Sequence, residues 1–496
     1  MAFPRERCIP KEISPYNIQL SPEDTPGNTH VKVLTQESAD KVSELLMVNH
    51  VRYHTLFDAV GFHNHTVHHL LTLWALGATP SEVQAMYDLN KPYQALIQYH
   101  PASVAAVKLK EPAFFKQCIG NLDYYQDYVR FFQDEIAVRG VPAVVNEYLF
   151  KGDELSDDIF ARMHSGFLHP MIHLGCGLEF SQPCLVAEAL AAGCVHDEWP
   201  EWFIFPVEEY LKSNPDVPSK SLLEIVTSLQ SDPVIANAVT PDDPLNKISD
   251  GLLKKVAKEL VPYLASYQVD ATPEDLQQKT TAMIHTCAYI LGAAQHPGKV
   301  EAIDFVMLHM STLGIFYPTF MAQDWISNEN KKRMLQWKAW GDAVMYAGCG
   351  CPKLYPERVT GYTPKRPQDG WPELCHRANV YGDDGHISKV IRAMLNTQEL
   401  PEPVEGFPLA KEDFLKIAHL ALDSVERMLE PGQYKVPDKI KKTVAEEMRQ
   451  DEEIVRVMVR WVRWCGVEGS WDNFPDLVEK SRGEEAVVGD ATIAAT

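Results

Sequence analysis

Apolar residues recur every three or four positions over long stretches of this chain, and strict alternation of apolar and polar residues is scarce. A spacing of three and four places apolar side chains on one face of an α-helix, whereas alternation marks half-buried strands. Turn-forming residues, including several prolines, interrupt these stretches at 10–26, 213–219, 240–244, 352–372 and 398–408. The pattern predicts an all-α or nearly all-α fold, a large irregular multi-helix bundle with long proline-containing loops.

Local signals refine this expectation. Thr79-Pro80-Ser81-Glu82 is a capping box with proline at the first helical position, so a helix should run from there to about Leu89. An apolar stripe over 444–462 predicts a second, long helix. We expect an N-terminal arm at 1–44, a single helical catalytic domain at 45–482, and a frayed C-terminal tail at 483–496, which lacks caps and bulky apolar residues.

Composition restricts the classes of partner. The chain has 46 Lys+Arg against 68 Asp+Glu, a net charge of -22, which is the wrong sign for a nucleic-acid-binding or anionic-membrane-binding protein. There is neither an N-terminal signal peptide nor an apolar run of about 18 residues, which predicts a cytoplasmic protein. The ten cysteines show no CxxC spacing, so we expect reduced thiols. A small-molecule substrate is the expected partner, and the oligomeric state is left open.

Familiar cofactor motifs are missing from the sequence. It contains no GxGxxG after a strand, no Walker loop, no GxSxG, no HExxH and no CxxCH. The GxG at Gly175 and Gly177 follows a helical stretch. We therefore expect no binding site of a known type for a tightly bound flavin or nicotinamide.

Histidines on apolar helical segments are the main chemical feature. In FHNHTVHHLL (62–71), His65 stands three and four positions before His68 and His69, a spacing that shares one helix face. In HSGFLHPMIH (164–173), Pro170 cannot donate a hydrogen bond to the carbonyl of Gly166. A kink there would leave a polar backbone group beside His169.

Two further histidines follow the same pattern. His309 lies on the apolar stripe of a helix expected over 302–313, and DDGHISKV (383–390) places His386 and Lys389 together in a first helical turn for which Asp384 suits the N-cap. Each histidine alone could be a core residue bonded to a carbonyl, and Lys389 alone could be a surface lysine. Together, four imidazole-bearing segments suit a helical metal site for Fe, Cu or Zn, and spacing does not choose the metal.

At these segments the chain resembles the questin oxidase family, fungal enzymes that oxidatively open anthraquinones in polyketide biosynthesis. The resemblance covers about residues 45–465 and rests on FHNHTVHHLLTLWALGA, HSGFLHPMIHLGCGLEF, EAIDFVMLHMSTLGIFYPTF and DDGHISKVIRA. Bacterial relatives keep an Asn-His, two further histidines and an Asp-x-His-x-x-Lys. A characterised branch holds non-haem iron with histidines and a carboxylated lysine.

The resemblance implies metal ligands and residues around them. It assigns the ligand role to His65, His169, His309, His386 and Lys389. It makes pocket or ligand-orienting candidates of His68, His69, His164, His173, His285 and Asp384, with His69 and His173 as substitute ligands. A desolvated neutral lysine amine can react with carbon dioxide to give a carbamate, which would supply the anion missing from an all-imidazole site.

The implied activity is a non-haem Fe(II)-dependent oxygenase. It would use dioxygen to cleave a ring C–C bond of an anthraquinone-type polyketide to a benzophenone-type acid, with NADPH as an external reductant. The alternatives are an NADPH-dependent Baeyer–Villiger monooxygenase on the same substrates, a zinc-dependent hydrolase, or a binding scaffold whose histidines are merely packed. A flat substrate needs an apolar aromatic slot, for which the motif segments offer Trp74, Phe167, Phe305, Phe316, Trp337 and Trp340.

Overall fold

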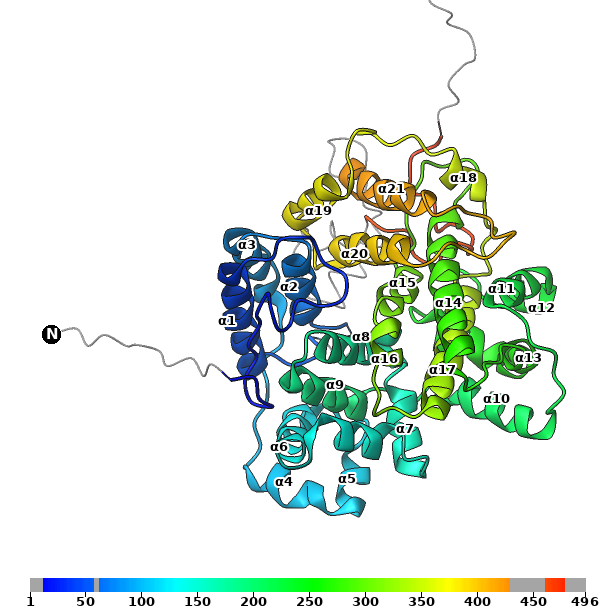
Figure 1. The fold of residues 1–496 in the computed structure, drawn as a ribbon. Helices are drawn as coiled ribbons and strands as arrows, with labels where there is room; N and C mark the ends of the chain where they lie inside the picture. The colour runs from blue at the N-terminus through cyan, green and yellow to red at the C-terminus, as the bar shows by residue number, and fades with distance from the viewer. Residues whose placement is uncertain (1–11, 58–61, 429–459, 478–496) are drawn as a thin grey trace, which may run out of the picture.

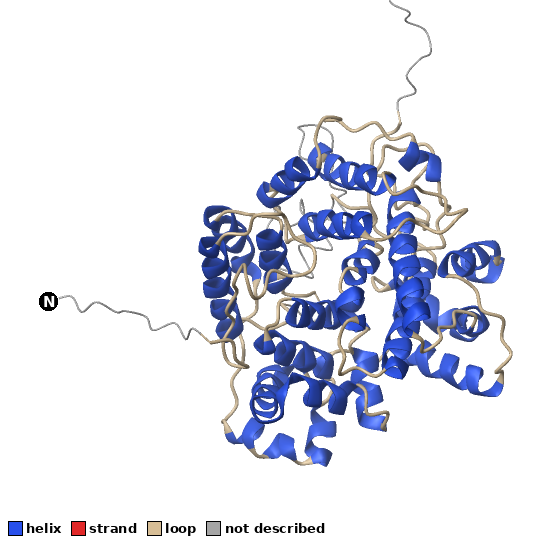
Figure 2. Cartoon of the chain, viewed as in Figure 1, coloured by secondary structure: helices blue, strands red, loops and turns tan. Residues whose placement is uncertain are grey.

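The computed structural model describes residues 12–57, 62–428 and 460–477. Over these residues the regular structure is helical, and the only β pairing is a handful of isolated bridges (Figures 1 and 2). The predicted all-α fold is confirmed. None of the described helices combines the length and the apolar character needed to cross a bilayer.

The first half of the described chain contains helices α1 to α12. They are α1 (Gln36–Arg52), α2 (Thr66–Ala75), α3 (Pro80–Asn90), α4 (Ser103–Ala106), α5 (Pro112–Cys118), α6 (Tyr125–Leu149), α7 (Glu154–Arg162), α8 (Ser165–Glu179), α9 (Pro183–Val195), α10 (Glu201–Ser213), α11 (Leu222–Ser231) and α12 (Pro233–Ala236). Helix α9 packs along both α6 and α8 and is buried over its whole length.

The second half adds the helices that complete the core. They are α13 (Lys254–Ala265), α14 (Pro273–Ala293), α15 (Leu308–Gly314), α16 (Tyr317–Met321), α17 (Asn328–Gly348), α18 (Pro356–Thr360), α19 (Trp371–Val380), α20 (His386–Glu399) and α21 (Asp413–Arg427). Short 3-10 turns occur at Lys91–Tyr93, Lys108–Lys110 and Leu122–Tyr124, and a π-helical segment spans Lys247–Leu253.

Four of these helices form a closed ring in the middle of the molecule. Helix α2 packs against α8, α8 against α15, α15 against α20, and α20 back against α2. Figure 1 shows α2 (blue), α8 and α15 (green) and α20 (yellow) facing a common centre although they are distant in sequence. Each of them carries one of the four histidine motifs, so the tertiary fold brings the motifs together.

Local capping explains where two predicted helices begin. The expected capping box is present at Thr79 and Glu82, and α3 runs to Asn90. The helix expected from 302 begins only at Leu308, because the Asp304 carboxylate accepts the backbone N–H groups of residues 306 and 307 and holds that stretch in a turn. Helix α1 begins at Gln36, inside the segment expected to be an arm. Most of the 444–462 stripe and the 483–496 tail lie outside the described residues.

Candidate metal centre

The predicted ligands meet at the centre of the helix ring. The Nε2 atoms of His65 and His169 are 2.7 Å apart. The ring centroid of His309 lies 4.9 Å from that of His169 and 5.4 Å from that of His386. The His386 ring is 4.6 Å from the His65 ring, which closes the group. Lys389 lies one helical turn after His386 and is near enough for its charge to lower the pKa of His65, His309 and His386.

Asp384 orients two of the imidazoles. One carboxylate oxygen accepts a hydrogen bond from His65 Nδ1 at 3.0 Å, and the other accepts one from His386 Nδ1 at 2.5 Å. A neutral imidazole carries one proton, so a bond donated by Nδ1 leaves a lone pair on Nε2. Carboxylate–histidine pairs of this kind fix the ring orientation of metal-ligating histidines.

Backbone carbonyls orient the other two imidazoles in the same sense. His169 Nδ1 lies 2.5 Å from the carbonyl oxygen of Gly166, and His309 Nδ1 lies 3.3 Å from that of Val306. The facing Nε2 atoms of His65 and His169 would then both be acceptors, and two lone pairs at such a separation repel unless a cation lies between them. The donor chemistry therefore fits a metal ion of the Fe, Cu or Zn type.

The backbone around Pro170 frees one of these carbonyls, as the sequence indicates. Gly166, Phe167 and Leu168 all have positive φ, so α8 is not regular there, and the Gly166 carbonyl bonds to the His169 ring instead of an amide. A Cβ at position 166 would lie 2.6 Å from His63 Nε2. Glycine is thus required both by the left-handed backbone and by close packing against an imidazole.

The start of α20 differs from the expectation that Asp384 caps this helix. The carboxylate that accepts backbone N–H groups there belongs to Asp383, which bonds to the amides of Gly385 and Ile387. Asp384 faces the histidines instead, so these adjacent carboxylates divide the capping and orienting roles. Gly385 itself has a φ of 95°, and a Cβ there would lie 2.6 Å from His69 Cγ.

The centre is almost completely removed from solvent. His309 and His386 are 0% exposed and Lys389 is 5% exposed. Burial lowers the pKa of all four imidazoles, to about 3 for His386, because it disfavours the imidazolium. Burial likewise lowers the pKa of the Lys389 ammonium to about 8. The imidazoles are therefore held in the neutral form, in which a ring nitrogen can bind a metal, and the Lys389 ammonium loses its proton more easily than that of an exposed lysine.

Three nitrogens of the centre have no hydrogen-bond partner among the described residues. They are Nε2 of His309, Nε2 of His386 and Nζ of Lys389. An unpaired buried polar atom destabilises the fold by about 1–3 kcal/mol, so three of them together indicate a missing partner. A cavity of about 10 Å³, room for about a single water molecule, adjoins Lys389.

The other predicted histidines divide into two groups. His68 and His173 lie beside the centre and share a 3.2 Å hydrogen bond, and His69 packs against the start of α20 with its pKa lowered by burial to about 3. His164 packs beside Trp337, and His285 stacks on Phe414, apart from the centre.

Sequence reasoning missed His196 and gave His63 no role. Their Nε2 atoms are 2.7 Å apart, and the His63 ring stacks on His169 at 4.1 Å. His196 follows α9 without any motif around it, so no local signal marks it.

The aromatic candidates also divide. Phe305 lies 4.6 Å from the His386 ring and Phe167 lies 5.5 Å from the His309 ring, whereas Phe316 lines the small cavity. Trp74 packs on Phe180, Trp337 on Phe160, and Trp340 is buried within α17. The segment 460–477 adds Trp461, whose ring is 6.2 Å from His386, and Trp464, whose ring is 6.1 Å from Phe167.

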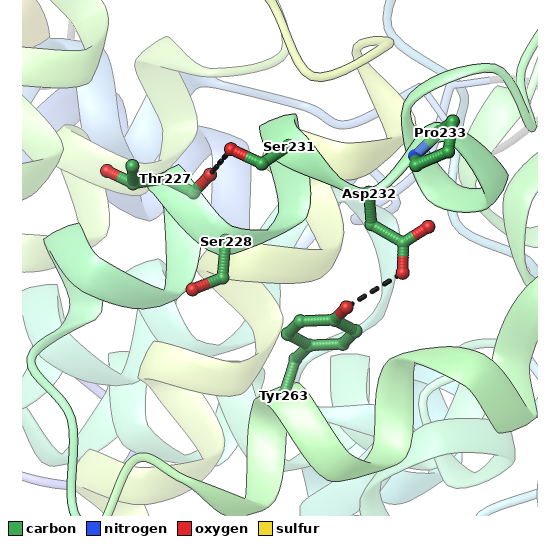
Figure 3. A pocket seen from close by; sticks show the side chains of 6 residues that line it. All are labelled: Thr227, Ser228, Ser231, Asp232, Pro233 and Tyr263. Atoms are coloured by element: carbon green, nitrogen blue, oxygen red, sulfur yellow. Dashed lines mark hydrogen bonds between the residues drawn. The ribbon is translucent and has the colours of Figure 1, made fainter.

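A larger surface pocket is unrelated to this centre. It lies between α11, the start of α12 and α13, where Tyr263 donates a 2.7 Å hydrogen bond to Asp232 and Ser231 bonds to the Thr227 carbonyl (Figure 3). Apart from Pro233, its side chains are hydroxyls and one carboxylate, and each hydroxyl bonds to a backbone carbonyl or to Asp232. The chemistry of the molecule is concentrated in the helix ring.

The fold and the site together define an all-α protein that gathers four imidazoles and one amine around a single buried point. The sequence profile of the Questin oxidase-like family matches residues 62–394, and the chain belongs to that family. The chain is 52% identical to "Oxidoreductase AflY" of Aspergillus parasiticus over 95% of this chain and 96% of the relative. It is 34% identical to the "Questin oxidase" of Aspergillus fumigatus over 78% of this chain and 88% of the relative.

A third relative carries a different description. The chain is 34% identical to "Baeyer-Villiger oxidase ptaJ" of Pestalotiopsis fici over 82% of this chain and 92% of the relative. All three names describe oxidation chemistry, and the chain is an oxidoreductase.

Proposed function

We propose that this chain is a non-haem iron-dependent oxygenase. Its reaction would cleave a ring C–C bond of an anthraquinone-type polyketide and give a benzophenone-type acid. The observation that carries the proposal is the orientation of the four imidazoles: each Nδ1 bonds to an oxygen, which leaves each Nε2 as a metal-binding lone pair. The names of the relatives favour oxidative chemistry on such substrates.

The five residues His65, His169, His309, His386 and Lys389 would hold the metal. Ferrous iron bound there would supply binding and activation of dioxygen. Lys389 could join as a neutral amine or, after reaction with carbon dioxide, as a carbamate, because burial already weakens its hold on the ammonium proton.

The protein's own residues would do three things. Asp384 and the two backbone carbonyls fix the direction of each imidazole, so little reorganisation is needed when the metal binds. The buried helix ring keeps water from reactive oxygen species. The rings of Phe167 and Phe305, which lie against His309 and His386, would offer apolar surface to a flat hydroxylated anthraquinone or its hydroquinone.

Elemental analysis of the purified protein tests the metal. We predict roughly one iron per chain and its loss in His309→Ala, because that imidazole is fully buried with no other partner for Nε2 in the described part of the chain. His285→Ala is the matched control, since His285 is buried but stacks on Phe414, and it should keep the iron. Full iron retention in His309→Ala would remove His309 from the ligand set.

Oxygen and reductant consumption test the reaction. Iron together with oxygen uptake on a hydroxylated anthraquinone supports the proposal, whereas zinc together with turnover in the absence of oxygen indicates a hydrolase. The name of the third relative favours one second candidate, an NADPH-dependent Baeyer–Villiger oxygenase. A Baeyer–Villiger oxygenase would consume one NADPH for each substrate molecule. The iron-dependent oxygenase would instead use its external reductant in no fixed ratio to substrate.

A further inference from the structure

A network of buried hydrogen bonds begins at His68, beside the candidate metal centre, and extends to three further helices. His68 Nε2 on α2 lies 3.2 Å from His173 Nδ1 on α8, and His173 Nε2 lies 2.8 Å from Glu188 Oε2 on α9. The second Glu188 oxygen lies 2.5 Å from His50 Nδ1 on α1. All four side chains are buried, and the proposed metal chemistry assigns a role to none of them.

The Glu188 carboxylate sets the direction of the hydrogen bonds that lead to His68. Although burial raises the pKa of Glu188, hydrogen bonds from His173 and His50 lower it to about 2, so the group is an acceptor only. His173 must therefore present its N–H at Nε2 to Glu188 and its lone pair at Nδ1 to His68. His68 then donates from Nε2, and its one remaining lone pair lies on Nδ1.

The lone pair on His68 Nδ1 accepts no hydrogen bond from the described residues. His68 Nδ1 is buried and has no hydrogen-bond partner within the described ranges. His68 lines the small cavity of about 10 Å³ together with Lys389 and the hydroxyl-bearing Thr72 and Thr312, while Phe316 belongs to its apolar lining. The space admits one oxygen atom with its hydrogens, and an acceptor beside it calls for a hydrogen-bond donor.

Two other titratable clusters of the described residues are satisfied within themselves. His50, Cys184 and Glu188 lie close enough to suggest a second metal site, but these groups already have partners: His50 bonds to Glu188, and the Cys184 thiol contacts the His50 ring. Lys338 and Asp342 form a fully buried ion pair that uses both carboxylate oxygens. His68 differs because its network ends on an unpaired Nδ1 of a side chain that lines a cavity.

We propose that Glu188, acting through His173, holds His68 as the hydrogen-bond acceptor for a hydroxyl group of the substrate in the cavity beside Lys389. Glu188 and His173 are positioning residues, and His68 is the residue that touches the ligand. The inference rests on the proposed function for its substrate class, hydroxylated anthraquinones. The ring that bears the hydroxyl requires the apolar lining around Phe316 to move, since the cavity itself fits only the oxygen.

Equilibrium binding without oxygen tests the subsite. The holoenzyme is titrated anaerobically with 2-hydroxyanthraquinone and with unsubstituted anthraquinone, and tryptophan fluorescence reports binding. We expect the hydroxylated compound to bind about tenfold more tightly, the size of one good hydrogen bond. His68→Phe and Glu188→Leu should abolish that preference, whereas Glu188→Gln, which keeps an acceptor oxygen for His173, should retain much of it.

His164→Phe is the matched control, because His164 is equally buried but bonds to the Phe160 carbonyl outside the network. It should bind both compounds as the unchanged protein does. Equal affinity of the unchanged protein for the two compounds, or a preference that survives His68→Phe, would overturn the inference. A hydroxyl preference that depends on His68 in a protein that consumes no oxygen would contradict the proposed function and leave the subsite standing.

The tautomer gives a second measurement that does not depend on ligand. Nitrogen NMR of histidine-labelled, zinc-loaded protein, with the His68 signals assigned by their absence in His68→Phe, should show Nε2 protonated and Nδ1 bare. Glu188→Leu should remove this bias and His50→Gln should not, since the bond from Glu188 to His173 persists there. A His68 tautomer that is unchanged in Glu188→Leu would contradict the positioning role.

Discussion

At the scale of single residues, the site depends on what each imidazole does with its Nδ1. One carboxylate serves two histidines: Asp384 accepts from His65 and from His386 with its two oxygens. Its neighbour Asp383 caps the helix instead. Adjacent residues of the same type thus have separate functions, which makes them a natural pair for substitution.

We predict that Asp384→Asn lowers metal affinity by about ten- to a hundredfold. An amide has a single acceptor oxygen, so one of the two imidazoles loses its partner and its fixed orientation. Competition with a chelator measures the affinity. Asp383→Asn should keep the metal and lose about 1 kcal/mol of unfolding free energy through the weakened cap, and an equal loss of metal in both variants would contradict the division of roles.

At the scale of elements, the beginning of α20 is where backbone conformation and the site depend on each other. Gly385 adopts left-handed backbone directly before His386 and lies against the His69 ring. This glycine lets the chain turn sharply between the orienting carboxylate of Asp384 and the imidazole of His386. The same device recurs at Gly166, which lies against His63 three residues before His169.

We predict that Gly385→Ala destabilises the protein by at least 1–2 kcal/mol, the approximate cost of left-handed backbone for a residue with a Cβ, and also reduces bound metal. The added Cβ would lie 2.6 Å from His69 Cγ and must displace either that ring or the start of α20. Gly382→Ala is the control, because its Cβ would meet only Leu89 Cδ2 at 3.4 Å and its φ is not positive. Urea unfolding and metal content are measured for both, and equal effects would refute the strain argument.

At the scale of the whole molecule, the fold buries an unusual number of neutral histidines. Burial lowers the pKa of His386 to about 3 and that of His164 and His196 to about 4, from the ordinary 6.5. The unfolded chain therefore binds protons that the folded chain does not bind as the pH falls below 6.5. Stability is present above that pH and is lost progressively between 6.5 and the folded-state values.

We predict that the metal-free protein loses about 1 kcal/mol of unfolding free energy for each such histidine between pH 6.5 and 5.5. Urea unfolding at a series of pH values measures the slope. His164→Phe removes one of these groups far from the centre, so its slope near pH 5 should be smaller by about 1.4 kcal/mol per pH unit. An unchanged slope in that variant would mean that His164 is already protonated in the folded state.

Much of this architecture is predictable from local patterns. The periodicity of apolar residues predicts the all-α fold, and Thr79 with Glu82 predicts the start of α3, because capping depends only on residues within one turn. Pro170 predicts the free carbonyl beside His169 for the same reason. The family motifs predict a set of candidate ligands, and the structure places these residues around one point.

Local sequence patterns do not predict contacts between segments that are distant in the chain. His196 stands beside His63, and Trp461 beside His386, only because the helices fold back on one another. The sequence around Asp384 suits a helix cap, and its partner His65 lies more than three hundred positions earlier, so its orienting role needed the tertiary structure. The late start of α15 follows from Asp304, whose carboxylate also accepts the amide of Cys465.

The sequence by itself determined that this chain is helical and which imidazoles are available for chemistry, since both follow from residue type and short-range spacing. Only the tertiary structure decided which nitrogen of each imidazole is free and which oxygens hold the others. A hydrogen bond selects its partner by distance in space, and helix packing sets that distance between residues that the chain keeps far apart.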